Sequence, residues 1–198
     1  METDQALLDA AGRMDKQALV RIFDLYSPAL FNYALRLSGD PVLADHIVGD
    51  VFASLMERLA AGKGPDSNLR SYLFEIAYHR IVDEARYAKR RAPIEAAALL
   101  PRDTYSTFSS VEDQILYKQL MYAFQHELTD DQRHVIFLRF LEEFSLRETA
   151  AILGKTVENV KVIQVRALAR LRKYIRRQPA RKPGSFSSVA NVPRISGA

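Results

Sequence analysis

The sequence contains no cysteine, and no apolar run in it approaches the roughly 20 residues that a membrane-spanning helix needs. The missing thiols exclude disulfide bonds and thiolate metal sites, and they suit a reducing compartment. The polar N-terminus, Met1-Glu2-Thr3-Asp4, does not resemble a signal peptide. We therefore expect a cytoplasmic protein that does not insert into membranes.

The signatures of common enzyme sites are also missing. The chain has no G-x-x-x-x-G-K-S/T loop and no G-x-G-x-x-G turn to bind a nucleotide. Glu75, His79 and Asp83 follow one another at intervals of four residues on one expected helix, which raises the alternative of a metal-dependent enzyme. A dimetal helical bundle needs matching ligands on other helices, and the remaining histidines show no such spacing. We interpret the three residues as a solvated polar stripe and predict no catalytic residue, metal or cofactor.

Positive charge is concentrated at the C-terminal end. From Lys155 onward the chain carries eleven Lys or Arg residues against a single acid, Glu158, whereas the rest has a net negative charge. Such an asymmetry indicates a polyanionic partner for the basic end. A solubilising tail is the alternative that charge alone leaves open.

Apolar residues recur with helical spacing through most of the chain, which predicts an all-α fold. One apolar face extends from Leu19 to Leu37, with Pro28 as a possible break in it. Asp40-Pro41 has the pattern of an N-cap followed by a first-turn proline, and the helix after it should end at the Gly/Pro-rich residues 62–65. A third helix is expected from Asn68 to the basic cluster Lys89-Arg90-Arg91.

The helices divide into two small domains joined by a flexible linker. The capping boxes Thr129–Gln132 and Ser145–Glu148, together with Thr156 as a further N-cap, predict helices that begin near residues 111, 130, 146 and 157. Composition predicts the following division: a helical domain at residues 1–91, a Pro/Ser/Thr-rich linker at 92–110, a second helical domain at 111–177 and a basic, disordered tail at 178–198.

The third expected helix is apolar on two opposite sides. One side carries Leu69, Tyr72, Leu73 and Ile76, and the other carries Phe74, Tyr78, Ile81 and Ala85. A helix of this kind is usually buried between neighbours. The alternative is that one aromatic side is exposed and stacks on unpaired nucleic-acid bases.

The segment from Ser145 to Arg172 has the pattern of a helix-turn-helix. A short capped helix is followed by a turn at Gly154-Lys155 and then by a longer basic helix. The inward face of that helix carries Val160, Ile163, Ala167, Leu168, Leu171 and Ile175, and its outward face mixes short apolar with charged side chains. Such a mixture can contact thymine methyl groups and phosphates together. A basic amphipathic helix in an ordinary bundle remains the alternative.

Four motifs, in order, resemble sigma factors of the extracytoplasmic-function type. They are A-D-H-I-V-G-D-V-F at residues 44–52, Y-L-F-E-I-A-Y-H at 72–79, L-T-D-D-Q-R at 128–133, and E-T-A-A-I-L-G followed by V-K-V-I-Q-V-R-A between 148 and 167. The similarity covers the chain from about Leu19 to Tyr174.

The resemblance implies partners and residue roles. The partners would be core RNA polymerase, through its largest-subunit clamp helices and its flap region, and promoter DNA; an anti-sigma factor is a further possible partner. Docking onto core polymerase would use Asp45, Val48, Asp50 and Phe52. Recognition of a melted minus-ten element would use Asp66, Ser67, Asn68, Tyr72, Phe74, His79 and Asp83. Recognition of minus-thirty-five DNA would use Glu158, Asn159, Lys161, Val162, Val165, Arg166 and Arg170.

Several positions depart from the family pattern. Tyr72 replaces a frequent tryptophan, His79 a usual asparagine and Gly49 a usual glutamine, so base-level specificity cannot be transferred from relatives. A DNA-binding regulator with an N-terminal sensor or dimerisation domain is the closest rival interpretation. Such a regulator would need neither the docking motif nor the aromatic helix.

Overall fold

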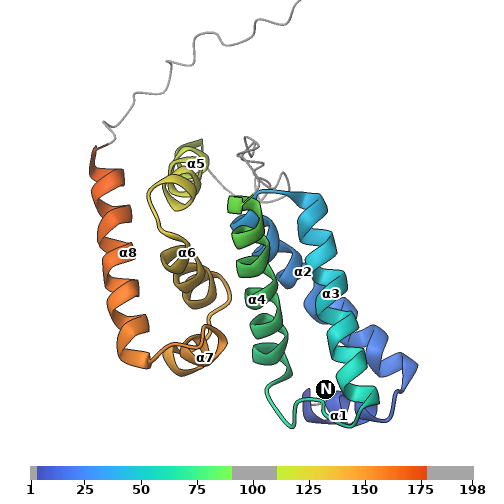
Figure 1. Ribbon diagram of the computed structural model, residues 1–198. Coiled ribbons are helices and arrows are strands. Elements are labelled where there is room, and N and C mark those ends of the chain that lie inside the picture. Colours follow the sequence, from blue (N-terminus) through green and yellow to red (C-terminus); the bar gives the residue numbers. More distant parts are fainter. Residues whose placement is uncertain (1–3, 91–110, 178–198) are drawn as a thin grey trace, which may run out of the picture.

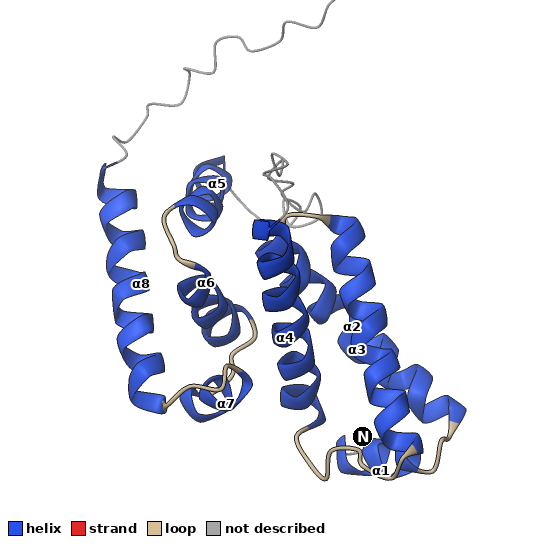
Figure 2. Ribbon diagram, viewed as in Figure 1, coloured by secondary structure: helices blue, strands red, loops and turns tan. Residues whose placement is uncertain are grey.

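The computed structural model describes residues 4–90 and 111–177, and within them every regular element is helical, which confirms the predicted all-α fold (Figure 2). The expected linker and the expected tail lie outside the described residues. The elements are α1 (Asp4–Gly12), α2 (Lys16–Ser38), α3 (Pro41–Ala60), α4 (Leu69–Arg90), α5 (Val111–His126), α6 (Asp130–Ile136), the π-helical segment η2 (Phe137–Leu141), α7 (Leu146–Ile152) and α8 (Val157–Arg177). In the described ranges no helix combines the length and apolar character needed to cross a lipid bilayer.

Caps confirm the helix starts predicted at Asp40, Thr129 and Ser145. The Asp40 carboxylate accepts hydrogen bonds from the backbone N–H groups of Val42 and Leu43, and Pro41 occupies the first turn of α3. Both predicted capping boxes, at Thr129 and Ser145, are formed in full. These side chains satisfy backbone donors that a helix start leaves unpaired, which is why the sequence pattern locates the starts so well.

Pro28 does not break the first long helix. The helix α2 passes through this exposed residue without interruption from Lys16 to Ser38. It ends where Gly39 adopts a φ of 75° and donates its backbone N–H to the carbonyl of Leu35. A left-handed residue of this kind closes the last helical turn at little cost only when it lacks a Cβ.

The helices form two groups that lie side by side (Figure 1). In the first group, α2, α3 and α4 pack on one another, and α1 packs on α2 and α3. In the second, α8 packs against α5, α6 and α7. The groups meet where α4 contacts α7 and α2 contacts α6, and we call this junction the seam.

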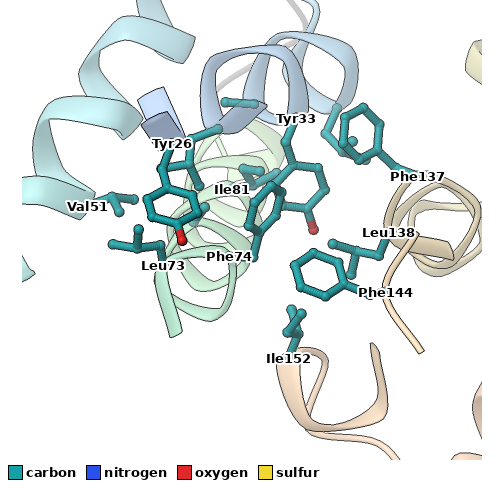
Figure 3. Packing of buried hydrophobic residues seen from close by; sticks show 14 of the residues in the cluster. Tyr26, Tyr33, Val51, Leu73, Phe74, Ile81, Phe137, Leu138, Phe144 and Ile152 are labelled. Carbon is teal, nitrogen blue, oxygen red and sulfur yellow. The ribbon is translucent and has the colours of Figure 1, made fainter. Parts of the chain in front are cut away.

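An aromatic cluster fills the seam (Figure 3). Tyr33 of α2 and Phe74 of α4 come from the first group, and Phe137 and Phe144 come from the second; all four side chains are buried. The second apolar side of the third predicted helix is therefore covered in this structure, as burial between neighbours requires.

Candidate nucleic-acid interface

The predicted helix-turn-helix consists of α7, a four-residue turn and α8. Gly154 provides the turn with a φ of 60°, and Thr156 begins the next helix by accepting a hydrogen bond from the backbone N–H of Asn159. On α8 the inward residues Val160, Ala167 and Leu171 are buried. The sequence therefore predicted correctly which side of α8 packs inward.

Six of the seven residues predicted for minus-thirty-five DNA lie on the exposed side of α8. They are Glu158, Asn159, Lys161, Val162, Val165 and Arg166. Val165 leaves 66% of its surface exposed and Val162 leaves 46%. The two exposed valines lie one turn apart among basic residues, and this position suits contact with a partner.

Arg170, the seventh residue, is also exposed, and its guanidinium contacts its own domain. One of its guanidinium nitrogens donates to the side-chain oxygen of Gln132 at 3.1 Å and lies 3.4 Å from the carbonyl of Glu127. Arg170 thereby connects α8 to the start of α6. Helical spacing placed this residue at the flank of the outward face, but spacing does not reveal a hydrogen-bond acceptor that lies 38 residues away in the sequence.

Arg139 of η2 also positions α8, the recognition helix of the predicted helix-turn-helix. Sequence reasoning did not identify this role of Arg139. Its Nε donates to the side-chain oxygen of Gln164 at 3.1 Å, and its guanidinium donates to the carbonyl of Phe144. Lys155, in the turn, forms an ion pair with Asp131 at 3.1 Å. These contacts fix α8 relative to α6 and α7 and leave its outward side free.

A polar groove between α3 and α4 brings together two of the residues predicted for the minus-ten element. It has a volume of about 350 Å³, and its lining includes His79 and Asp83. The other lining residues are Ser54, Glu57, Arg58, Ile76 and Arg80, none of which the motif comparison had singled out. These residues recur at helical spacing on α3 and α4. The sequence could therefore have located them beside His79 if it had shown that the two helices are neighbours.

The remaining predicted minus-ten residues do not join this groove. Asp66, Ser67 and Asn68 are exposed in the loop before α4, and Asp66 borders a different cavity between this loop and α1. The backbone carbonyl of Asp66 accepts a hydrogen bond from Gln5 of α1 at 3.2 Å. The loop is thus tied to α1, an element to which sequence reasoning assigned no functional role.

Phe74 is less accessible than a base-contacting role requires, and Tyr72 is partly buried. Phe74 is fully buried, with ring centroids 5.4 Å from Tyr33 and 5.1 Å from Phe144. The phenol oxygen of Tyr72 is buried without a hydrogen-bond partner, and burial raises the pKa of this phenol. In the arrangement described, Phe74 cannot contact a base directly, whereas Tyr72 is partly exposed. The expectation for Phe74 therefore requires a structure in which the seam is open.

The four predicted docking residues divide between surface and core. Asp45 and Asp50 are exposed, whereas Val48 and Phe52 are buried. Phe52 instead supports Phe23 of α2, whose ring lies 4.8 Å away and is 44% exposed. The apolar contact on this face would therefore come from Phe23, which the motif did not mark because it lies on another helix.

The polar stripe on α4 does not form a metal site in the residues that the structure describes, because these residues contain no group of three His, Asp or Glu side chains placed to hold an ion. His79 and Asp83 line the groove described above, whereas Glu75 is exposed outside it. Asp83 forms a 3.5 Å ion pair with Arg86. The stripe therefore combines a groove-lining part with a solvated part.

Family models match both groups of helices. The model for sigma-70 region 2 matches residues 22–91, and the model for sigma-70 region 4 matches residues 126–173. The chain is 26% identical to the ECF RNA polymerase sigma factor BldN of Streptomyces coelicolor. The match covers 83% of this chain and 64% of BldN. It is also 26% identical to the ECF RNA polymerase sigma factor SigX of Bacillus subtilis, covering 78% of this chain and 81% of SigX.

Two solved structures share the fold. CnrH, in complex with the cytosolic domain of CnrY, superposes with a TM-score of 0.65 at 22% identity, covering 87% of this chain and 97% of CnrH. The sigma factor RpoE of Bartonella quintana, in complex with the anti-sigma factor NepR, superposes with a TM-score of 0.63 at 26% identity, covering 80% of this chain and 97% of RpoE.

Proposed function

The chain belongs to the extracytoplasmic-function group of the sigma-70 family, and on that premise we propose that it binds core RNA polymerase and directs it to a subset of promoters. It would act by binding and positioning, without catalysis of its own. The domain at residues 1–91 would dock on core polymerase and read a melted minus-ten element. The domain at 111–177 would read minus-thirty-five DNA and contact the flap region of the polymerase.

The observation that carries the proposal is the exposed side of α8. An α-helix fits the major groove of B-form DNA, where each base pair presents its own pattern of donors, acceptors and methyl groups. Lys161 and Arg166 are exposed cations suited to phosphates, and Val165 is an exposed apolar side chain suited to a thymine methyl group. Val162 and Val165 lie on the same side as these cations, so one surface of α8 offers contacts for both methyl groups and phosphates.

The groove between α3 and α4 is the proposed site for a base extruded from the minus-ten element. Its side chains offer donors and acceptors for the edge of a base, from His79, Asp83 and Arg58 among others. Unstacking a base costs a few kcal/mol, which edge contacts in a shaped groove can offset. Asp66, Ser67 and Asn68 would guide the neighbouring nucleotides along the exposed loop.

The acidic and aromatic face of α2 and α3 is the proposed docking surface for the clamp helices of the polymerase. Asp45 supplies negative charge there, and Phe23 supplies an exposed ring. Asp50, also exposed, lies toward α4, where it forms a 3.7 Å ion pair with Arg80. An aromatic residue surrounded by charge is typical of the centre of a protein interface.

RpoE, a related sigma factor, forms a complex with an anti-sigma factor, and we extend this to the proposal that an anti-sigma protein also binds this chain.

In vitro transcription tests the function. The purified full chain is added to core RNA polymerase with a library of genomic fragments, and we expect transcripts from a defined subset of promoters. His79→Ala should change the minus-ten preference among them, whereas His126→Ala, which replaces an exposed histidine of α5, should leave it unchanged. The absence of any promoter-specific transcript with folded protein would refute the proposal.

The docking face has its own test. Asp45→Lys should weaken binding to core polymerase more than Asp9→Lys, which changes the net charge equally on α1. Both affinities are measured by fluorescence titration of the full chain with core enzyme. Equal effects of the two variants would place the docking face elsewhere.

A further inference from the structure

The second domain has a polar groove that the function proposed above does not use. It lies between α5 and α8, which pack side by side (Figure 1), and it has a volume of about 320 Å³. Its lining residues are His126, Glu127, Arg170, Lys173, Tyr174 and Arg177. Only Arg170 among them belongs to the residues predicted for minus-thirty-five DNA. The other five have no role in the recognition of promoter DNA or core polymerase proposed above.

Three aromatic rings meet at this groove. The ring centroid of Tyr122 lies 4.2 Å from that of His126 and 5.8 Å from that of Tyr174. The planes of the two tyrosine rings are only 26° apart, so these rings are stacked. Tyr122 leaves 53% of its surface exposed, and His126 is exposed as well. The rings therefore form a platform, open to solvent, on which a further flat ring can stack.

Three cations line the same groove. Arg170, Lys173 and Arg177 follow one another at intervals of three and four residues, so they lie on one side of α8. Arg170 is held at the wall of the groove by its hydrogen bond to Gln132. Within the described ranges, Lys173 and Arg177 are exposed and form no ion pair with an acid. Their charges are therefore available to a ligand that carries phosphate groups.

Cations beside exposed rings are the combination that binds unpaired nucleotides. The cations attract the phosphates, and the rings stack on the bases, because every base has a flat π face. A duplex offers its phosphates but keeps these faces stacked between neighbouring base pairs, so it would leave the platform unused. An acidic protein segment could pair with the cations, but it supplies no regular series of flat rings.

Glu127 favours RNA over DNA as the ligand. An exposed acid at the groove repels phosphates, so it weakens binding unless it also accepts a hydrogen bond from the ligand. The 2′-hydroxyl of ribose is a donor for such a bond, and deoxyribose lacks it. We propose that this groove binds single-stranded RNA, with bases on the rings, phosphates at Lys173 and Arg177, and a ribose hydroxyl at Glu127.

The proposed RNA site is separate from the DNA-reading surface of α8. Tyr174 lies twelve residues beyond Val162 on this helix, which is about 18 Å at 1.5 Å per residue. The major groove of B-form DNA is only about 12 Å wide, and a recognition helix contacts base edges with its first turns. The inference rests on the function proposed above in one respect: a sigma factor held on RNA polymerase would meet the single-stranded RNA that the enzyme makes.

Binding of a short oligonucleotide to the full chain tests the site. The probe is a fluorescein-labelled oligouridylate of about 12 nucleotides, a length within the range that single-strand sites cover, and it forms no base pairs with itself. Fluorescence anisotropy measures its affinity in a salt series. We expect saturable binding with a slope of log affinity against log salt of about −2, because three cations would neutralise phosphates.

Two matched pairs of variants separate the rings from the cations. Tyr122→Leu should weaken oligouridylate binding at least about fivefold, whereas Phe140→Leu, which removes a similarly exposed ring from η2, should not weaken it. Arg177→Ala should reduce the salt slope by about 0.7. Arg176→Ala removes the same charge from an exposed neighbour that does not line the groove, and it should leave the slope nearly unchanged.

Oligodeoxyuridylate of the same length separates RNA from DNA, because it differs from the probe only in lacking the 2′-hydroxyl. The parent chain should bind it about fivefold more weakly than oligouridylate, the effect of one lost hydrogen bond. Glu127→Ala should bring the two affinities together. Equal affinities in the parent chain would overturn the assignment to RNA.

Other outcomes would overturn the site itself. These are no binding of oligouridylate, or equal effects within either pair of variants, which is the result expected for unspecific attraction by charge. A DNA duplex that loses as much affinity through Tyr122→Leu as oligouridylate does would show that the groove belongs to a duplex-binding surface. Promoter-specific transcription without oligouridylate binding would refute this site alone, and oligouridylate binding without such transcription would refute the proposed function alone.

Discussion

We predict that the stability of the fold falls between pH 7 and pH 5 because of one buried histidine. His134 leaves only 3% of its surface exposed, and burial, together with the neighbouring Arg133, lowers its pKa from 6.5 to about 4. The carboxylates of Asp130 and Asp131 raise this pKa and the ammonium of Lys155 lowers it, each less strongly than burial and Arg133 do. The imidazole is therefore neutral in the folded chain at pH 7.

The sign and the magnitude follow from proton linkage. Below pH 6.5 the unfolded chain binds a proton at this histidine while the folded chain does not, so acid favours unfolding until the pH reaches about 4. The stability that the neutral histidine contributes is thus present above pH 6.5 and is lost as the pH falls. Between pH 7 and pH 5 the loss amounts to about 2 kcal/mol. For a chain of this size it corresponds to a drop in Tm of about 4 to 8 °C.

Thermal unfolding followed by circular dichroism provides the assay. His134→Asn keeps a polar group near the Tyr33 hydroxyl but cannot bind a proton, so its Tm should fall less between pH 7 and pH 5 than that of the parent chain. Glu142, whose pKa burial raises, acts in the opposite direction, but it is present in both proteins and cancels in the comparison. His126→Asn, at an exposed position, should keep the full pH dependence. An equal pH dependence in the parent and in His134→Asn would refute the reasoning.

Three further predictions follow from particular side chains. Gly154→Ala should destabilise the chain by about 1 kcal/mol in urea titrations, because φ is 60° while no atom lies within 4 Å of the added Cβ. Phe74→Ala should cost about 3 to 5 kcal/mol in the same titrations, whereas Phe23→Ala, at a half-exposed position, should cost under 1 kcal/mol and mainly weaken core binding. Val165→Ser should reduce affinity by at most about 1 kcal/mol, and only on minus-thirty-five DNA with a thymine at the facing position, as measured by fluorescence anisotropy.

Local chemistry made much of the fold predictable. Thr129 and Ser145 locate two helix starts because their caps use only residues within three positions in the sequence. Gly154 and the apolar spacing of α8 likewise identify the turn and the inward side of the recognition helix. These features depend on short stretches of chain, which a sequence displays directly.

The tertiary contacts were not predictable in the same way. Periodicity shows that the side of α4 bearing Phe74 needs a cover, but it does not show that Phe144 supplies that cover. The pairing of Tyr33 with His134 and the use of Arg170 inside its own domain also join distant parts of the chain. A motif transferred from a family marks a position on a helix, whereas accessibility depends on what packs against it.

The π-helical segment η2 sets the angular phase of the second domain relative to the seam. In a regular α-helix each residue advances by about 100°, so His134 and Glu142, eight residues apart, would point about 80° away from each other. A π turn absorbs one extra residue, which reduces the offset to about 20°. The backbone N–H of Glu142 bonds to the carbonyl of Phe137, five residues earlier, as such a turn requires. A deletion of one residue in η2 would leave His134 and Glu142 seven α-helical positions apart, again offset by about 20°, so both should still face Tyr33 and Arg70. Regular α-helical bonding of the undeleted segment would instead turn Glu142 away from Arg70 while His134 still faces Tyr33.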